Sequence, residues 1–206
     1  SREYPLYQPE NGWAEQRPQD WREAAIDTIG RVIRQAGISG NEVRGVGLSG
    51  QMHGLVMLDE AGEVIRPSII WCDQRTGAET EEMLRRLPRE KWMEITANPP
   101  LTGWTAAKNL WVKNHEPEHY ARCRHILLPK DYIRYVLTGQ FATEVSDASG
   151  MQLLDVPGRS WSREVLNALE IDENLLGRVY ESCEVTGKIL PEIAAATGLS
   201  TDTVVV

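Results

Sequence analysis

The segment VRGVGLSGQMHGLVML, residues 43–58, determines the architecture that we predict for this chain. Its two ends, residues 43–49 and 55–58, are short apolar runs with β-branched residues, which predicts strands. The letters GVGLSG match the GxGxxG dinucleotide fingerprint, which requires a helix directly after the glycines to receive a pyrophosphate. Because an extended run follows instead, we interpret the glycines as part of a strand that another backbone approaches closely. We therefore predict no nicotinamide site.

On the N-terminal side of this segment, the sequence predicts a long amphipathic helix over residues 18–36. Pro18 suits the first turn of a helix and Gly37 suits its C-cap. The apolar residues that recur on one helical face are Trp21, Ala25, Ile29, Val32, Ile33 and Ala36. A helix with one apolar face is expected to pack on a sheet.

On the C-terminal side, a third strand is predicted over residues 64–71, joined to the second by a hairpin turn at residues 59–62. Beyond Asp73 the period of the apolar residues becomes helical. The expected helices are residues 76–87, 89–96, 106–114, 117–122, 131–137, 162–169 and 191–197, with strands at 125–128 and 151–154. We see no internal repeat or linker, so the sequence predicts one compact unit of the mixed α/β class.

The charge balance disfavours a nucleic-acid partner. The 206 residues include 22 Lys and Arg against 30 Asp and Glu, a formal net charge of −8. Nucleic-acid binding usually needs a clustered positive surface, and no basic run here exceeds the pair Arg85 and Arg86. We therefore predict no nucleic-acid binding.

Cysteine usage and hydropathy indicate a cytoplasmic protein. The three cysteines, Cys72, Cys123 and Cys183, are odd in number and form neither a CxxC pair nor a Cys/His cluster, which fits a reducing compartment. No apolar stretch approaches the roughly 20 residues that a membrane helix requires, and nothing at the start resembles a signal peptide. We predict no membrane partner.

Two further motifs match catalytic patterns by letter and lack their geometry. HEPEH, residues 115–119, fits the zinc motif HExxH, but Pro117 prevents the continuous helix that would place both imidazoles on one face. We interpret it as a solvated helix start and predict no metal site. GLSGQ, residues 47–51, lacks the second glycine of a nucleophile elbow at Ser49.

The seven tryptophans divide into core and candidate pocket residues. Trp21, Trp92 and Trp111 lie in helical patterns and are expected in the core. Trp71 and Trp104 lie beside polar, turn-rich segments. These two are candidate pocket walls.

Polar side chains, together with Met52 and Trp71, cluster at the ends of the predicted strands, where open α/β sheets bind their ligands. They are Gln51, Met52 and His53 after the first strand, Trp71, Asp73 and Arg75 after the third, Lys130 and Asp131 after residues 125–128, and the segment SDASG, residues 146–150, with Asp147. A small polyol or keto sugar requires short donors and acceptors beside an aromatic or thioether wall. This set of residues supplies both.

Five motifs make the sequence recognisable. They are GWAEQRP at residues 12–18, GQMHG at 50–54, WCDQRT at 71–76, LLPKDY at 127–132 and SDASG at 146–150. In this order, and over nearly the whole chain, they resemble the FGGY family of carbohydrate kinases. GQMHG is similar to the members that act on xylulose, and less similar to those that act on glycerol or gluconate.

The resemblance implies a fold and an activity. The fold would be α/β and ribonuclease H-like (actin-like ATPase), with residues 1–206 a fragment of the single N-terminal sugar-binding domain, incomplete at both ends. The nucleotide-binding C-terminal domain would be absent from this chain. The activity would be ATP- and Mg²⁺-dependent phosphorylation of the 5-hydroxyl of D-xylulose to D-xylulose 5-phosphate, by a protein expected to form a homodimer.

The resemblance also implies which residues bind the sugar. His53 would hydrogen-bond the ketose hydroxyls, and Met52 would contribute backbone polarity and an apolar wall. The further candidates are Gln51, Trp71, Asp73, Trp104 and Asp147. Structural alternatives stay open, because His53 would also suit a strand-end turn, Asp73 with Arg75 an internal ion pair, and Lys130 with Asp131 a pair at a helix start.

The sequence departs from the family pattern at both ends. The family's first strand and its Asp-x-Gly-Thr phosphate loop would precede Ser1, and the glycine-rich segment with the general-base Asp would follow Val206. The last residues, TVVV, suggest a strand that expects neighbours on both sides. We therefore expect no catalytic residue here and no kinase activity from this chain alone. The alternatives are another FGGY sugar or polyol kinase, or a non-catalytic sugar-binding module.

Overall fold

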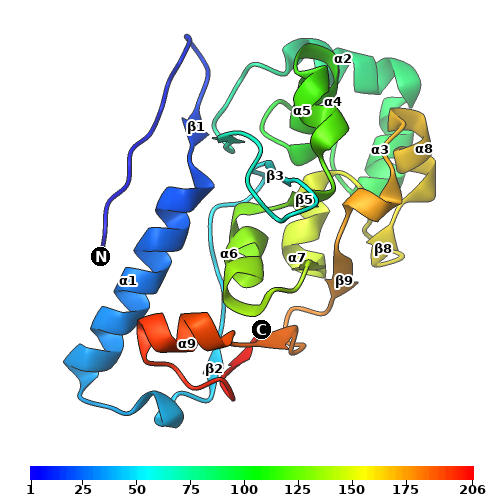
Figure 1. Ribbon diagram of the computed structural model, residues 1–206. Helices are drawn as coiled ribbons and strands as arrows, with labels where there is room; N and C mark the ends of the chain where they lie inside the picture. The colour runs from blue at the N-terminus through cyan, green and yellow to red at the C-terminus, as the bar shows by residue number, and fades with distance from the viewer.

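The computed structural model describes all residues of the chain, Ser1–Val206. Its longest helix, α1 (Pro18–Ala36), runs along one edge of the molecule and packs against α6 (Pro129–Thr138) and α9 (Pro191–Thr197) (Figure 1). The predicted bounds of α1 are confirmed, with Pro18 in the first turn and Gly37 as a left-handed C-cap at φ 65°. Two residues of its predicted apolar face are exposed, Val32 (56%) and Ala36.

The remaining helices gather mostly at the opposite end of the molecule (Figure 1). They are α2 (Gly77–Arg86), α3 (Arg89–Thr96), α4 (Thr105–His115), α5 (Pro117–Arg122), α7 (Val145–Ala148) and α8 (Arg163–Leu169). All seven helices predicted after Asp73 are present, to within two residues at each end. The four-residue α7, which overlaps the start of the SDASG motif, was not predicted.

The strands are short and form five small sheets. A three-stranded sheet has the order β10 (Gly187–Lys188), β11 (Val204–Val205), β2 (Gly45–Val46), with β11 antiparallel to β10 and parallel to β2. The paired strands are β1 (Glu15–Gln16) with β4 (Ser68–Ile69), β3 (Val56–Leu58) with β5 (His125–Leu127), β6 (Ala142–Glu144) with β9 (Arg178–Tyr180), and β7 (Leu154–Asp155) with β8 (Ser160–Trp161). The terminal valines therefore form a strand with a neighbour on each side.

The strand pair β3 and β5 separates two hydrophobic clusters. Met57 of β3 faces a cluster built from α2, α3, α4 and α8, whereas its neighbours Val56 and Leu58 face a second cluster built from α1, α6, α9 and β11. Because successive side chains of a strand point to opposite faces, a strand covered on both faces is apolar throughout. This explains why the sequence LVML is continuously apolar.

Three predicted strands are corrected. Residues 64–71 pair as a strand only at β4 (Ser68–Ile69), with an isolated bridge between Leu58 and Val64. Within residues 43–49, only β2 (Gly45–Val46) pairs as a strand. Its one partner strand is β11, and the glycines after β2 allow the chain to bend toward His53. Residues 151–154 are not a strand. They contain the end of a 3-10 turn and Gln152 in a left-handed conformation at φ 59°, and β7 begins only at Leu154. A short apolar run cannot be assigned to strand or turn by periodicity alone.

The rejected motifs behave as predicted. The glycines of GVGLSG lead into no helix, and Pro117 separates α4 from α5, so His115 and His119 lie on different helices. Each of these imidazoles contacts a glutamate instead, Glu79 at 3.0 Å and Glu116 at 2.7 Å. No helix of the structure has the length and apolar character needed to cross a membrane.

Candidate functional site

The polar cleft is a cavity of about 660 Å³ between the chain that follows β2, the start of α6, the segment around α7 and the loop after β9. Its candidate ligand-binding side chains come from all four regions and from the residue before α4. They are Met52, His53, Trp104, Lys130, Glu144, Asp147 and Ser182. Several elements that are distant in sequence therefore converge on one polar cavity, as the strand-end residues predicted.

His53 is held in an unusual conformation in the wall of this cleft. Its backbone is left-handed at φ 61°, a region that non-glycine residues adopt only when their surroundings impose it. Its Nδ1 lies 3.1 Å from the carbonyl oxygen of Gly150, and its ring packs at 4.3 Å against the indole of Trp104. A carbonyl only accepts hydrogen bonds, so Nδ1 carries the proton and Nε2 is left with a lone pair.

The environment of His53 favours the neutral imidazole. Burial of the ring, together with the positive charge of Lys108, lowers its pKa from the usual 6.5. A neutral Nε2 can accept a hydrogen bond from a hydroxyl group. The residue therefore has the chemistry expected for contact with a polyol or ketose.

A buried lysine lies at the centre of the cleft's carboxylates. The Nζ of Lys130 is 2.9 Å from Asp131, 3.4 Å from Glu144 and 3.6 Å from Asp147. The helix-start pair anticipated for Lys130 and Asp131 is thus present within a larger network. Lys130 neutralises part of the charge of three carboxylates.

Two carboxylates of this network, Asp147 and Glu144, have pKa values that are shifted in opposite directions. Burial raises the pKa of Asp147 to about 6, with the charges of Asp131 and Glu144 adding to the rise against the attraction of Lys130. Burial would raise the pKa of Glu144 too, but hydrogen bonds from Ser182 and from the N–H groups of residues 146 and 147 lower it. Glu144 therefore stays ionised and caps α7, whereas Asp147 can change its protonation state near pH 6.

The structure brings together four of the seven predicted sugar-binding residues. Met52, His53, Trp104 and Asp147 all line the polar cleft, and Met52 is 52% exposed there.

The other three predicted residues lie elsewhere. The amide of Gln51 donates to the side chain of Gln16 at 2.7 Å. Trp71 is 54% exposed and does not line the cleft. Asp73 is fully buried, where it accepts from the N–H of Ala14 at 2.6 Å and pairs with Arg75 at 2.8 Å. The internal ion pair left open for Asp73 is therefore the arrangement that the structure contains.

Sequence reasoning missed other residues of the cleft. Glu144 had a weak signal, since an acidic residue directly before a short polar helix can cap it. Ser182 had none, because its hydroxyl reaches Glu144 only through the parallel pairing of β6 with β9. Arg134, which also lines the cleft and donates to Thr186 at 2.6 Å, is one arginine within a helical pattern.

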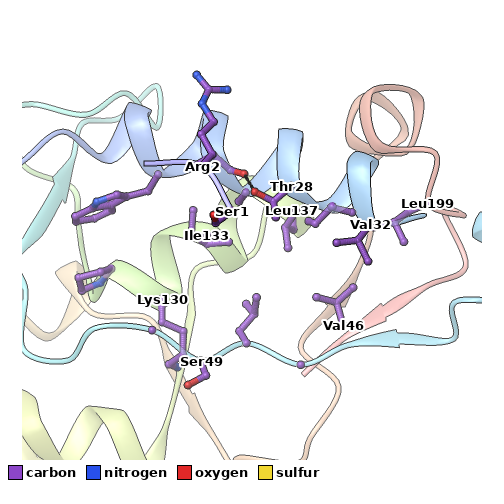
Figure 2. Close-up of a pocket in the computed structure, with 18 of the residues that line it drawn as sticks. Ser1, Arg2, Thr28, Val32, Val46, Ser49, Lys130, Ile133, Leu137 and Leu199 are labelled. Carbon is purple, nitrogen blue, oxygen red and sulfur yellow. Dashed lines mark hydrogen bonds between the residues drawn. The ribbon is translucent and has the colours of Figure 1, made fainter. Parts of the chain in front are cut away.

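A second cavity of the same volume, about 660 Å³, adjoins the polar cleft. This apolar groove lies between α1, α6 and the chain after β2, and Figure 2 shows Lys130 and Ser49 at one end of it and Val32 and Val46 toward the other. Its lining is largely aliphatic and offers few groups that could orient a sugar. The polar cleft is therefore the better candidate for a polyol or ketose site.

The carboxylates of the polar cleft do not fit a magnesium ion. The carboxylates of the polar cleft surround the ammonium of Lys130, which occupies the position that a cation would need. No group of three or more His, Cys, Asp or Glu side chains is arranged to hold a metal ion. We therefore assign no metal-binding role to these residues.

Comparison with known proteins gives consistent matches. Residues 1–206 match the N-terminal domain of the FGGY family of carbohydrate kinases. The chain is 39% identical to the xylulose kinase of Bacillus subtilis over 97% of its length, and 40% identical to that of Escherichia coli over 100% of its length. In each case the chain spans 40% of the relative.

Solved structures give the same result for the fold. Xylulose kinase from Rhodospirillum rubrum superposes with a TM-score of 0.94 at 28% identity, over 99% of this chain and 42% of that one. Gluconate kinase from Lactobacillus acidophilus superposes with a TM-score of 0.91 at 26% identity, over 99% of this chain and 41% of that one.

Proposed function

This chain belongs to the FGGY family of carbohydrate kinases, and we propose that the whole protein transfers a phosphoryl group from ATP to D-xylulose, giving D-xylulose 5-phosphate. Membership confirms the resemblance carried by the five sequence motifs and the ribonuclease H-like α/β fold expected from it. The observation that supports the substrate is the 39–40% identity to two xylulose kinases over nearly all of the chain.

The polar cleft supplies the sugar site in this proposal. Nε2 of His53 accepts a hydrogen bond from one ketose hydroxyl, and Asp147, ionised at neutral pH, accepts from another. Trp104 and Met52 form the apolar walls against the carbon chain. Asp73 contributes by fixing Arg75 and Ala14 in the core, and we assign no sugar contact to Gln51 or Trp71.

The phosphoryl-transfer chemistry is proposed to come from parts of the protein outside this chain. That reaction requires in-line positioning, neutralisation of phosphate charge and a group that orients the attacking hydroxyl. Within the polar cleft, the carboxylates are engaged by Lys130 or cap a helix. We therefore expect the 206-residue chain alone to show no ATP-dependent phosphorylation, and measurable turnover by it would refute this division of roles.

A substrate panel tests the proposed activity. The whole protein is assayed for ADP release with D-xylulose, D-ribulose, D-fructose, D-gluconate and glycerol. We expect kcat/KM for D-xylulose to exceed that of every other substrate by about tenfold or more, a difference of about 1.4 kcal/mol in transition-state binding. A higher value for another substrate would assign a different FGGY kinase activity.

Two alternatives make distinct predictions in the same assay. Gluconate phosphorylation would follow from the similarity to the gluconate kinase structure. Binding of D-xylulose without turnover by the whole protein, measured by calorimetry, would indicate a non-catalytic sugar-binding module.

Three further expectations stay predictions. They are use of Mg²⁺ with ATP, formation of a homodimer, and a cytoplasmic location. Metal dependence of the ADP-release assay tests the first, light scattering of the whole protein tests the second, and cell fractionation tests the third.

A further inference from the structure

Lys108 in α4 is a buried cation that the proposed function does not yet use. Its side chain is fully buried, and its Nζ donates to the carbonyl oxygens of His53 at 2.9 Å, Trp104 at 3.4 Å and Gly103. No carboxylate forms an ion pair with it. Buried lysines are normally paired with an acid, so an ammonium bound only to carbonyl oxygens is unusual.

The carbonyl oxygens that Lys108 binds belong to residues that line the polar cleft or lie next to a lining residue. One comes from the segment that carries His53, and the other two come from the turn that carries Trp104. The hydroxyl of Thr105 donates to the same His53 oxygen at 3.2 Å. The first two turns of α4 therefore supply two donors to a single peptide group.

That peptide group belongs to the strained residue of the site. His53 is left-handed at φ 61°, a conformation that persists only where neighbouring groups fix it. Its imidazole is confined by the carbonyl of Gly150 and the indole of Trp104, and a Cβ added at Gly150 would clash with the ring. Rotation of the His53 peptide would therefore move the imidazole out of its contacts with Gly150 and Trp104.

We propose that Lys108, with Thr105 as a second donor, is a positioning residue for sugar binding, which holds the His53 carbonyl and the Trp104 turn together so that imidazole and indole form one wall of the cleft. This inference rests on the proposed function of the cleft as a sugar site. Lys108 acts through His53 and Trp104.

The electrostatics of Lys108 agree with a role in the site. Burial lowers its pKa to about 7, against the attraction of Asp73 and Cys72 and with the repulsion of Arg75. The fold thus holds the amine of Lys108 in a place that disfavours its charged form. Strongly perturbed groups of this kind cluster at functional sites.

The test compares two lysines of the same helix in the whole protein. Lys108→Met keeps the unbranched side chain to within one atom of its length and removes its donors. Lys113→Met is the matched control, because Lys113 contacts Glu170 at the other end of α4, away from the cleft. KM and kcat for D-xylulose, KM for ATP, and the ¹H–¹³C signals of the His53 imidazole are measured for each.

The inference predicts a selective effect. Lys108→Met raises KM for D-xylulose by about tenfold or more and leaves KM for ATP within about twofold, while Lys113→Met changes neither by more than about twofold. The His53 imidazole signal moves in sugar-free Lys108→Met and not in Lys113→Met. Thr105→Val, which removes the weaker donor, raises KM for D-xylulose by about threefold and provides the test if Lys108→Met does not fold.

The inference fails if folded Lys108→Met, or folded Thr105→Val in its place, keeps the wild-type KM for D-xylulose and the wild-type His53 signal. Failure of the proposed function is a separate outcome, recognised because the unmodified protein would not phosphorylate D-xylulose. In that case the positioning role of Lys108 is decided by the His53 imidazole signal of the sugar-free protein alone. The same signal in Lys108→Met as in the unmodified protein would overturn that role.

Discussion

The polar cleft and the apolar groove have the same volume, about 660 Å³, and share the chain at residues 47–50 and Lys130 as a common wall. They differ in what covers that wall. On one side α7 and the loop after β9 bring carboxylates and hydroxyls, and on the other α1 and α6 bring aliphatic side chains. Cavity size therefore does not distinguish the two cavities, whereas the chemistry of the lining does.

The comparison predicts two opposite mutational signatures. Changes in the polar cleft should alter sugar binding without lowering stability, because we propose that its polar residues serve a ligand. Changes in the apolar groove should alter stability with little effect on sugar binding, because its residues contribute buried apolar area. The variants that follow test these signatures.

The largest effect is expected at His53. His53→Ala removes the hydroxyl acceptor and should raise KM for D-xylulose and lower kcat/KM by about 10–100-fold, equivalent to about 1.4–2.7 kcal/mol. The melting temperature should change little. The matched control is His119→Ala, a partly exposed histidine on α5 outside both cavities. An unchanged kcat/KM in folded His53→Ala would assign the residue to structure.

Ionisation of the partly buried Asp147 carboxylate in the polar cleft should lower the free energy of unfolding. Its folded-state pKa of about 6 lies above the unfolded value of about 3.9. The folded protein therefore binds more protons than the unfolded one between about pH 4 and 6, and stability falls as pH rises through that window.

Asp147→Asn removes this effect. Its free energy of unfolding should exceed that of the wild type by about 1–2 kcal/mol at pH 7.5, and the difference should shrink toward zero near pH 4. Urea denaturation at the two pH values measures it, with KM for D-xylulose raised in the same variant. A difference independent of pH would contradict the titration assigned to Asp147.

The smallest effect is expected in the apolar groove. Ile29→Ser, on the face of α1 that lines the groove, should lower the free energy of unfolding by about 1 kcal/mol through lost apolar burial. KM for D-xylulose should stay within about twofold. A larger change in KM than in His119→Ala would remove the distinction between the two cavities.

The helices could be predicted from the sequence because their signals are local. The 19 residues of α1 carry a complete apolar period, an initial Pro18 and a terminal Gly37, and the structure reproduces those bounds. Strand lengths could not be predicted in the same way. β2 is short because its partner β11 lies about 160 residues away and pairs with only two of its residues, which no local pattern encodes.

The positions of the candidate site residues were predictable in part for the same reason. Met52 and His53 lie at the bend after a strand, and that position could be inferred from the glycines around them. Asp73 also follows a strand, but its side chain turns into the core, and sequence position alone does not give the direction of a side chain. Lys108 was missed because a single lysine in an amphipathic helix normally faces solvent.

The central claim is that the polar cleft binds the sugar through His53, and the four histidines of this chain allow a direct test. Whole protein with ¹³C-labelled histidine is titrated with D-xylulose while the imidazole signals are followed. Our account predicts a saturable shift of the His53 signal, with those of His115, His119 and His125 unmoved. Saturation of the protein with D-xylulose while the His53 signal stays in place would contradict it.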